Sequence, residues 1–428
     1  MECANFAKYS WVDLAFSVIG VCTFLVDWGS DIWVATEFYC RGDVLWFGVL
    51  VGLMALSSVV VQMFSWFWFQ YDRELPGFGG ISGPGGDPQA GGSAVMFGDR
   101  VKLSCLLHVL QLGFLCRHFW VIWQGFRVWW RKEEGSEYAV YLTHDLSMLR
   151  LIETFCESAP QLTLMIYVML QTNKARTVQF VSIAASTTSM AWMVVDYHRS
   201  LRSFVPDKAK QTWSSSLVYF LWNLLLISPR VASLALFSSV LSSYIAVHFT
   251  LLWVVFVAWV WRQKTDFMDS HAGEWLYRAT VGLIWYFSWF NVAEGQTRDR
   301  SIIYHSFITV DCAILLTTWW LYRDPIESQS YSLALIISLP LVYISGLLLK
   351  TLYYCCFHPK LWRPPQRDPV LPDDLPDSEV KFRDMSAQDG SLSQPLVNKR
   401  MAVLATNFYS ERRELESATT KMKVESHI

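Results

Sequence analysis

The chain has 428 residues, of which 53% are hydrophobic and only 17% are charged, with a formal net charge of −2. The apolar fraction is higher than the roughly 45–50% of soluble domains, so the composition excludes an ordinary soluble protein. It predicts an all-α, polytopic membrane protein. The small net charge gives no sign of a nucleic-acid partner, and we expect none.

The first apolar segment runs from Trp11 to Phe38 and contains three aspartates, Asp13, Asp27 and Asp31. At about 100° per residue they lie within roughly 80° of arc on one helix face. A charge at the bilayer centre costs about 2.5–3.5 kcal/mol on insertion scales, so this stripe needs polar partners on the facing surface.

A second stripe lies in the membrane-length stretch from Arg150 to Gln171. Its four members also share roughly 80° of one helix face, and they are Arg150, Glu153, Glu157 and Gln161. Pro160 follows within the same stretch and is expected to break or bend the helix, which frees backbone carbonyls near the carboxylates.

The chain contains ten apolar segments of about membrane length. They are 11–38, 44–71, 103–130, 142–171, 178–204, 213–240, 244–261, 275–292, 302–321 and 331–357. Candidate cations for the carboxylate stripes include Arg199, three residues after Asp196, and Arg230, directly after Pro229. Pro160 and Pro229 both indicate broken or re-entrant helices. The sequence therefore predicts a bundle with a polar, charge-paired interior.

The remaining regions read as a loop and a tail attached to a membrane domain of residues 1–362. Residues 76–98 are rich in Gly, Pro and Ser and predict a flexible loop. Residues 363–428 predict a disordered tail, which the positive-inside rule places in the cytosol. Within the tail, the motif DLPDS (Asp374, Asp377 and Ser378) has the form that executioner caspases cleave, after Asp377.

Motifs of ATP-driven transport and of hydrolysis are not found in the sequence. It contains no GxxxxGK[ST], HExxH or GxSxG pattern, so we expect neither an enzyme nor a cofactor, and any transport would run downhill. Two other interpretations of the stripes stay open. Internal ion pairs could simply specify helix packing, or the carboxylate pairs could bind a cation, although cation sites usually have more ligands.

Several long motifs resemble the XK family. They are FLVDWGSDIW (24–33), QMFSWFW (62–68), LSMLRLIETFCESAPQL (146–162), MVVDYHRSLR (193–202), YFLWNLLLISPR (219–230) and EWLYRATVGLIWYFSWFNVAEG (274–295). The similarity extends from Trp11 to about Trp362. It implies eight membrane spans, two half-length inserted helices and two cytosolic termini; the 76–98 loop departs from the family pattern.

The resemblance also implies a function. Members of this branch are caspase-activated phospholipid scramblases of the plasma membrane, which expose phosphatidylserine as an engulfment signal in apoptosis. It implies a lipid route lined or braced by Asp13, Asp27, Asp31, Glu153, Glu157, Gln161, Asp196, Arg199 and Arg230. Trp46 would close this route, although a Trp at such a position is more often an interfacial anchor.

The implied partners are phospholipids, executioner caspases and a single-span glycoprotein of the basigin and neuroplastin kind, with a higher-order oligomer left open. Two rival functions remain at this point. One is a solute or ion transporter that uses the same charges, and the other is a non-transporting scaffold for a lipid-transfer protein.

Overall fold

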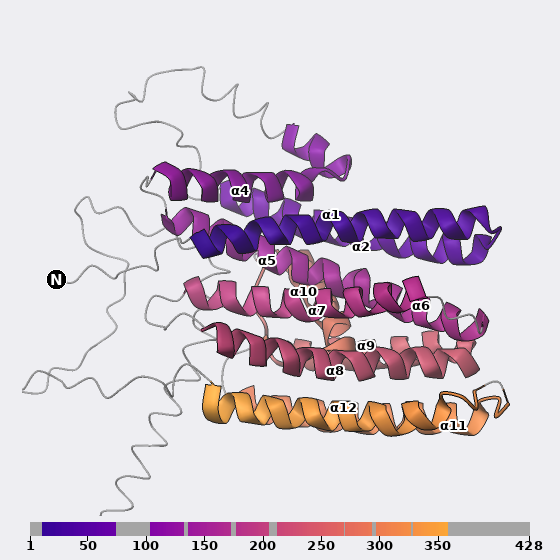
Figure 1. Cartoon of the computed structure of the whole chain (residues 1–428). Coiled ribbons are helices and arrows are strands. Elements are labelled where there is room, and N and C mark those ends of the chain that lie inside the picture. Colours follow the sequence, from indigo (N-terminus) through magenta and orange to yellow (C-terminus); the bar gives the residue numbers. More distant parts are fainter. Residues whose placement is uncertain are drawn as a thin grey trace, which may run out of the picture.

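The computed structural model describes residues 11–73, 103–131, 136–172, 177–204, 212–268, 270–292, 297–326 and 328–357. All regular structure in these ranges is helical, which confirms the predicted all-α class. Most of the helices lie alongside one another in a bundle (Figure 1). The 76–98 loop and the tail with its caspase motif lie outside the described residues.

The long helices follow the apolar segments of the sequence. α1 (Trp11–Cys40) and α2 (Val44–Arg73) form a hairpin whose turn contains Gly42 at φ 78°. The other helices are α4 (Gly113–Arg131), α5 (Ser136–Cys156), α6 (Ser158–Thr172), α7 (Thr177–Phe204), α8 (Trp213–Val240), α9 (Ser242–Arg262), α10 (His271–Phe287), α11 (Thr297–Tyr322) and α12 (Ser332–Leu352), which continues into the π-helical turn η1 (Tyr353–Phe357).

The described helices include six that are long and apolar enough to cross a membrane, or up to seven if one bent pair counts as a span. α6 and α10 have only 15 and 17 residues, fewer than the about 20 that a bilayer requires. A multi-pass membrane protein is therefore supported. The arrangement of eight spans and two half-length helices stays a prediction.

The predicted apolar segment 103–130 is not one continuous helix in the structure. Its helices, Leu103–Val109 and Gly113–Trp130, meet at an angle of 120°. The bend occurs where Gln111 adopts a positive φ of 62°. Gly113 permits the close return of the chain, because a Cβ atom there would lie 2.6 Å from the His108 ring.

The two predicted proline breaks have different outcomes. Pro160 lies in the first turn of α6, where a missing N–H breaks no helical hydrogen bond, and the helix boundary expected there is confirmed at Glu157. The break expected at Pro229 is wrong, because α8 runs through it without interruption. Pro229 is buried against neighbouring helices, an environment in which a helix tolerates proline.

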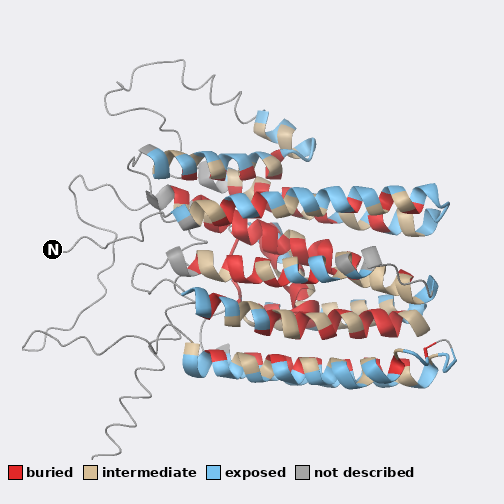
Figure 2. Ribbon diagram, in the orientation of Figure 1, coloured by how far each residue is buried: buried red, intermediate tan, exposed pale blue. Residues whose placement is uncertain are grey.

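Buried residues concentrate on the central helices, whereas the outer helices are largely exposed (Figure 2). Many of the exposed residues have large apolar side chains. In the apolar window of α8, 67% of residues are buried inside the protein, compared with 11% in that of α9. Apolar exposure of this extent is unusual in a soluble monomer and suits helices surrounded by lipid.

Candidate functional site

Polar side chains from α1, α5, α6 and α7 meet inside the bundle, and we call this set the acidic seam. Its members are Asp13, Thr23, Asp27, Asp31, Arg150, Glu153, Glu157, Ser158, Gln161, Asp196 and Arg199. Asp13 and Asp31 are 31 − 13 = 18 residues apart on α1, which corresponds to about 27 Å at 1.5 Å per residue. The seam is therefore nearly as long as the bilayer core is thick, about 30 Å.

Arg150 lies at the centre of the acidic seam and joins three helices. Its Nη2 donates to Thr23 Oγ1 on α1 at 2.9 Å, and its Nη1 lies 3.5 Å from Asp196 Oδ2 on α7. Asp27 and Glu153 also attract this guanidinium electrostatically. Since the Arg150 side chain is only 3% exposed, its charge is balanced almost entirely by protein groups.

The next section of the seam is acidic and buried. Ser158 Oγ donates to Asp27 Oδ2 at 3.0 Å and so joins α6 to α1. Asp31 and Glu157 are 7% and 8% exposed, and each is subject to repulsion from neighbouring carboxylates. The side chains of Gln161 and Glu157 lie close enough to Asp31 to interact with it, although Asp31 Oδ2 and the amide nitrogen of Gln161 make no hydrogen bond of normal length. Asp31, Glu157 and Gln161 thus form a buried polar group that is only loosely hydrogen-bonded.

The opposite end of the seam contains a small cavity. Its lining residues come from α1, α5 and α7 and are Asp13, Phe16, Val140, Thr143, Asp196, Arg199 and Ser200. The Arg199 guanidinium lies 4.3 Å from the Phe16 ring centroid and interacts electrostatically with Asp13 and Asp196. Arg199 thus provides a second cation in the seam, as the sequence predicted.

Trp46 belongs to a hydrophobic cluster beyond the Asp31 end of the seam. Its ring centroid lies 5.2 Å from that of Tyr167 on α6. The buried members of this cluster are Ala35, Phe38, Leu50 and Val168. Trp46 is half-buried between helices, so it is more than an isolated interfacial anchor. A gating role stays a prediction.

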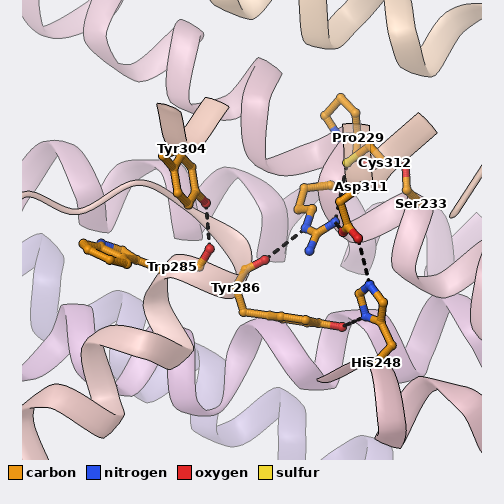
Figure 3. A network of polar contacts seen from close by, with 9 residues as sticks. Pro229, Ser233, His248, Trp285, Tyr286, Tyr304, Asp311 and Cys312 are labelled. Atoms are coloured by element: carbon orange, nitrogen blue, oxygen red, sulfur yellow. Dashed lines mark hydrogen bonds and ion pairs between the residues drawn. The ribbon is translucent and has the colours of Figure 1, made fainter. Parts of the chain in front are cut away.

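A separate polar centre lies where His248, Tyr286 and Asp311 meet (Figure 3), and Arg230 is its cation. It is fully buried, makes an ion pair with Asp311, and donates from Nε to the Tyr286 carbonyl at 3.0 Å. His248 lies 3.0 Å from Asp311 Oδ1 through Nε2 and 2.9 Å from Tyr286 Oη through Nδ1. This centre ties α8, α9, α10 and α11 together. Arg230 therefore pairs with Asp311 and not with the carboxylate stripes for which it was a candidate cation; a bracing role stays a prediction.

Sequence reasoning missed several of these partners. Asp311 and His248 lie inside apolar segments, so the signal that marked the other charges could have found them. Thr23 and Ser158 carry no such signal, because hydroxyl residues are common in membrane helices. Within the described ranges, no group of three or more His, Cys, Asp or Glu side chains is placed to hold a metal ion, so the cation-binding interpretation gains no support.

Comparison with known proteins places this arrangement in a family. The family model for XK-related proteins matches residues 15–359, which include nearly all of α1 and every other described helix. The chain belongs to the XK-related protein family. The resemblance seen in the sequence motifs is thereby confirmed.

Relatives named XK-related protein 8 match almost the whole chain. The protein of Gasterosteus aculeatus is 74% identical over 411 residues, which cover 96% of this chain and 100% of the relative. That of Tetraodon nigroviridis is 70% identical over 412 residues, with the same coverage. That of Pan troglodytes is 40% identical over 413 residues, which cover 94% of this chain and 95% of the relative. The acidic seam of this XK-related chain lies almost entirely in the matched region; only Asp13 precedes residue 15.

Proposed function

We propose that the chain is a phospholipid scramblase of the plasma membrane, bidirectional and independent of ATP, which exposes phosphatidylserine in apoptosis after caspases cleave its tail. The observation that carries this proposal is the acidic seam. It is a chain of charged and polar side chains inside an apolar bundle, over a length close to that of the bilayer core.

The acidic seam has the chemistry that a headgroup needs in hydrocarbon. Ammonium groups of phospholipids can pair with carboxylates such as Asp27 and Asp31, and phosphates with Arg150 and Arg199. The acyl chains can stay in lipid beside the bundle. Since such exchange runs down existing gradients, it requires no ATP site and no covalent chemistry.

In this proposal, the described arrangement is the closed state of the lipid route. Asp31, Glu157 and Gln161 are buried in protein, and the Trp46 cluster covers the end beyond them. A headgroup can enter only if α1 separates from α6. In this proposal the intact tail favours the closed state, and both termini lie in the cytosol.

Reconstitution tests the proposal against its rivals. Intact and tail-trimmed protein would be placed in liposomes without ATP, and the movement of labelled phosphatidylserine and phosphatidylcholine between leaflets would be measured beside ion flux. If the chain is a scramblase, the tail-trimmed protein should move both labelled lipids between the leaflets. Ion or solute flux without lipid movement would favour a transporter, and neither activity would favour a scaffold for a lipid-transfer protein.

We also propose two kinds of protein partner. A single-span glycoprotein of the basigin and neuroplastin kind would accompany the chain to the cell surface, and executioner caspases would cut the tail. Co-purification from cells tests the first. Normal surface delivery in cells that lack both glycoproteins would exclude it.

A further inference from the structure

The Arg150 guanidinium packs directly against the α1 backbone at Gly20. A Cβ atom at this position would overlap Nη1 and lie 2.8 Å from Cζ of Arg150. Gly29 on the same helix has nothing within 4 Å of its Cβ position. The close contact is therefore specific to Gly20, where any side chain would fill the space that the guanidinium occupies.

Thr23, one helical turn further on, fixes the orientation of the guanidinium. Its Oγ1 donates to the Gly20 carbonyl at 2.8 Å. The single hydroxyl proton is thereby used, so the oxygen faces Arg150 Nη2 as an acceptor, at 2.9 Å. Asp196 holds the other side of the guanidinium, 3.5 Å from Nη1. Arg150 is thus placed between α1 and α7 by contacts that depend on the shape of α1 at Gly20.

We propose that Gly20 and Thr23 are positioning residues that fix the Arg150 charge within the acidic seam. The inference rests on the proposed function, in which Arg150 is the cation that headgroup phosphates meet beside Asp27 and Glu153. A methyl group at position 20 displaces the guanidinium, because the flexible side chain yields before the helix backbone does. Displacement removes the contacts with Thr23 and Asp196 and leaves the neighbouring carboxylates without their cation.

The test compares five variants of the tail-trimmed protein: Gly20→Ala, Gly29→Ala, Thr23→Val, Arg150→Lys and the double variant Gly20→Ala/Arg150→Lys. Scrambling in liposomes and the unfolding temperature in detergent are measured for each. We expect Gly20→Ala to lower the scrambling rate about tenfold, because the seam loses its positioned cation, and Gly29→Ala to match the parent protein. Thr23→Val keeps the side-chain shape and removes the acceptor, so it should also slow scrambling.

The double variant separates positioning from a general packing defect. Lysine lacks the forked guanidinium and leaves room for the methyl group, so Gly20→Ala should have little further effect when Arg150 is already lysine. Equal behaviour of Gly20→Ala and Gly29→Ala, or additive losses in the double variant, would overturn the inference. The unfolding temperatures test the coupling between positions 20 and 150 without any lipid transport. If the parent protein fails to scramble, the proposed function is refuted, and the positioning of Arg150 can still be tested by unfolding.

Discussion

Arg230 has an exposed fraction of 0%, and its charge is balanced by a network that spans four helices. Removing one partner of a buried ion pair leaves the other charge without compensation, which usually costs more than the pair itself contributes. The network formed by Arg230, Asp311, His248 and Tyr286 is therefore expected to determine whether the protein folds, separately from any role in lipid movement.

The first prediction is that Arg230→Ala lowers the free energy of unfolding by about 3–5 kcal/mol. The variant should give little monodisperse protein in detergent and a clearly lower unfolding temperature. Arg41→Ala is the matched control, because Arg41 forms an exposed ion pair with Glu37, and such pairs contribute about 0–1 kcal/mol. A further variant, Arg230→Met/Asp311→Leu, should recover stability, because it removes both charges. An unfolding temperature of Arg230→Ala equal to that of the parent protein would contradict this account.

Sequence reasoning identified many of these charges but not their pairing. Arg230 and Asp311 are 81 residues apart, and Arg150 and Thr23 are 127 apart. A charge in an apolar segment shows that a partner is needed, whereas the identity of that partner depends on tertiary packing. Arg199 lies only three residues after Asp196 in the sequence, so their proximity could be expected. The partner of Arg230 lies on another helix and was missed.

In its middle part, α1 is joined to α5 and α6 by polar side chains. Its backbone packs mainly against α2, α4 and α7, and it reaches α5 and α6 through the Arg150–Thr23 and Ser158–Asp27 hydrogen bonds. Such contacts can be exchanged for contacts with a headgroup at little net cost, because one hydrogen bond replaces another. At the Trp46 cluster, by contrast, the contacts between helices are apolar. A polar headgroup offers no equivalent contacts to replace them.

The second prediction is therefore that Trp46→Ala raises scrambling by the intact, uncleaved protein. Removing the ring takes away its contact with Tyr167 and weakens the hydrophobic cluster that covers the seam. Trp33→Ala is the control, since Trp33 is 73% exposed on α1. The assay is lipid exchange in liposomes at equal amounts of folded protein. A Trp46→Ala variant as inactive as intact wild type would argue against a gate at this position.

The extent of the elements was largely predictable from sequence. The predicted segment 213–240 coincides with α8, and 11–38 falls two residues short of α1. Bilayer thickness limits the length of such helices, so apolar runs reveal them directly. The bend at Gln111 and the continuity of α8 through Pro229 were not predictable, because both depend on what packs around the backbone.

For the whole molecule, the proposed regulation requires that the tail bind the closed bundle better than the open one. Cleavage after Asp377 would release 428 − 377 = 51 residues. To change a 99:1 closed population to 1:99, removal of the tail must withdraw about 5.5 kcal/mol of preference. Docking of a short segment of the tail can supply only part of this free energy. Dimerisation or phosphorylation is therefore expected to contribute as well.

The third prediction is that Asp377→Ala abolishes phosphatidylserine exposure during apoptosis and leaves surface expression intact. The substitution removes the aspartate after which the proposed cleavage occurs, and it lies outside the region 1–362 predicted as the membrane domain. Annexin binding and an immunoblot of the tail would be recorded on the same cells. Exposure with a demonstrably uncut tail would show that the tail is not the switch.

The central claim is that the acidic seam is the lipid route, and one comparison on a single helix tests it most directly. Asp31→Asn and Glu37→Gln each neutralise one carboxylate of α1, but Asp31 is buried in the seam, whereas Glu37 forms an exposed ion pair with Arg41 at the helix end. Both would be made in the tail-trimmed protein and assayed in liposomes at equal amounts of folded protein. The account predicts a several-fold slower exchange of labelled phospholipid for Asp31→Asn and an unchanged rate for Glu37→Gln. Equal rates for the two variants would contradict it.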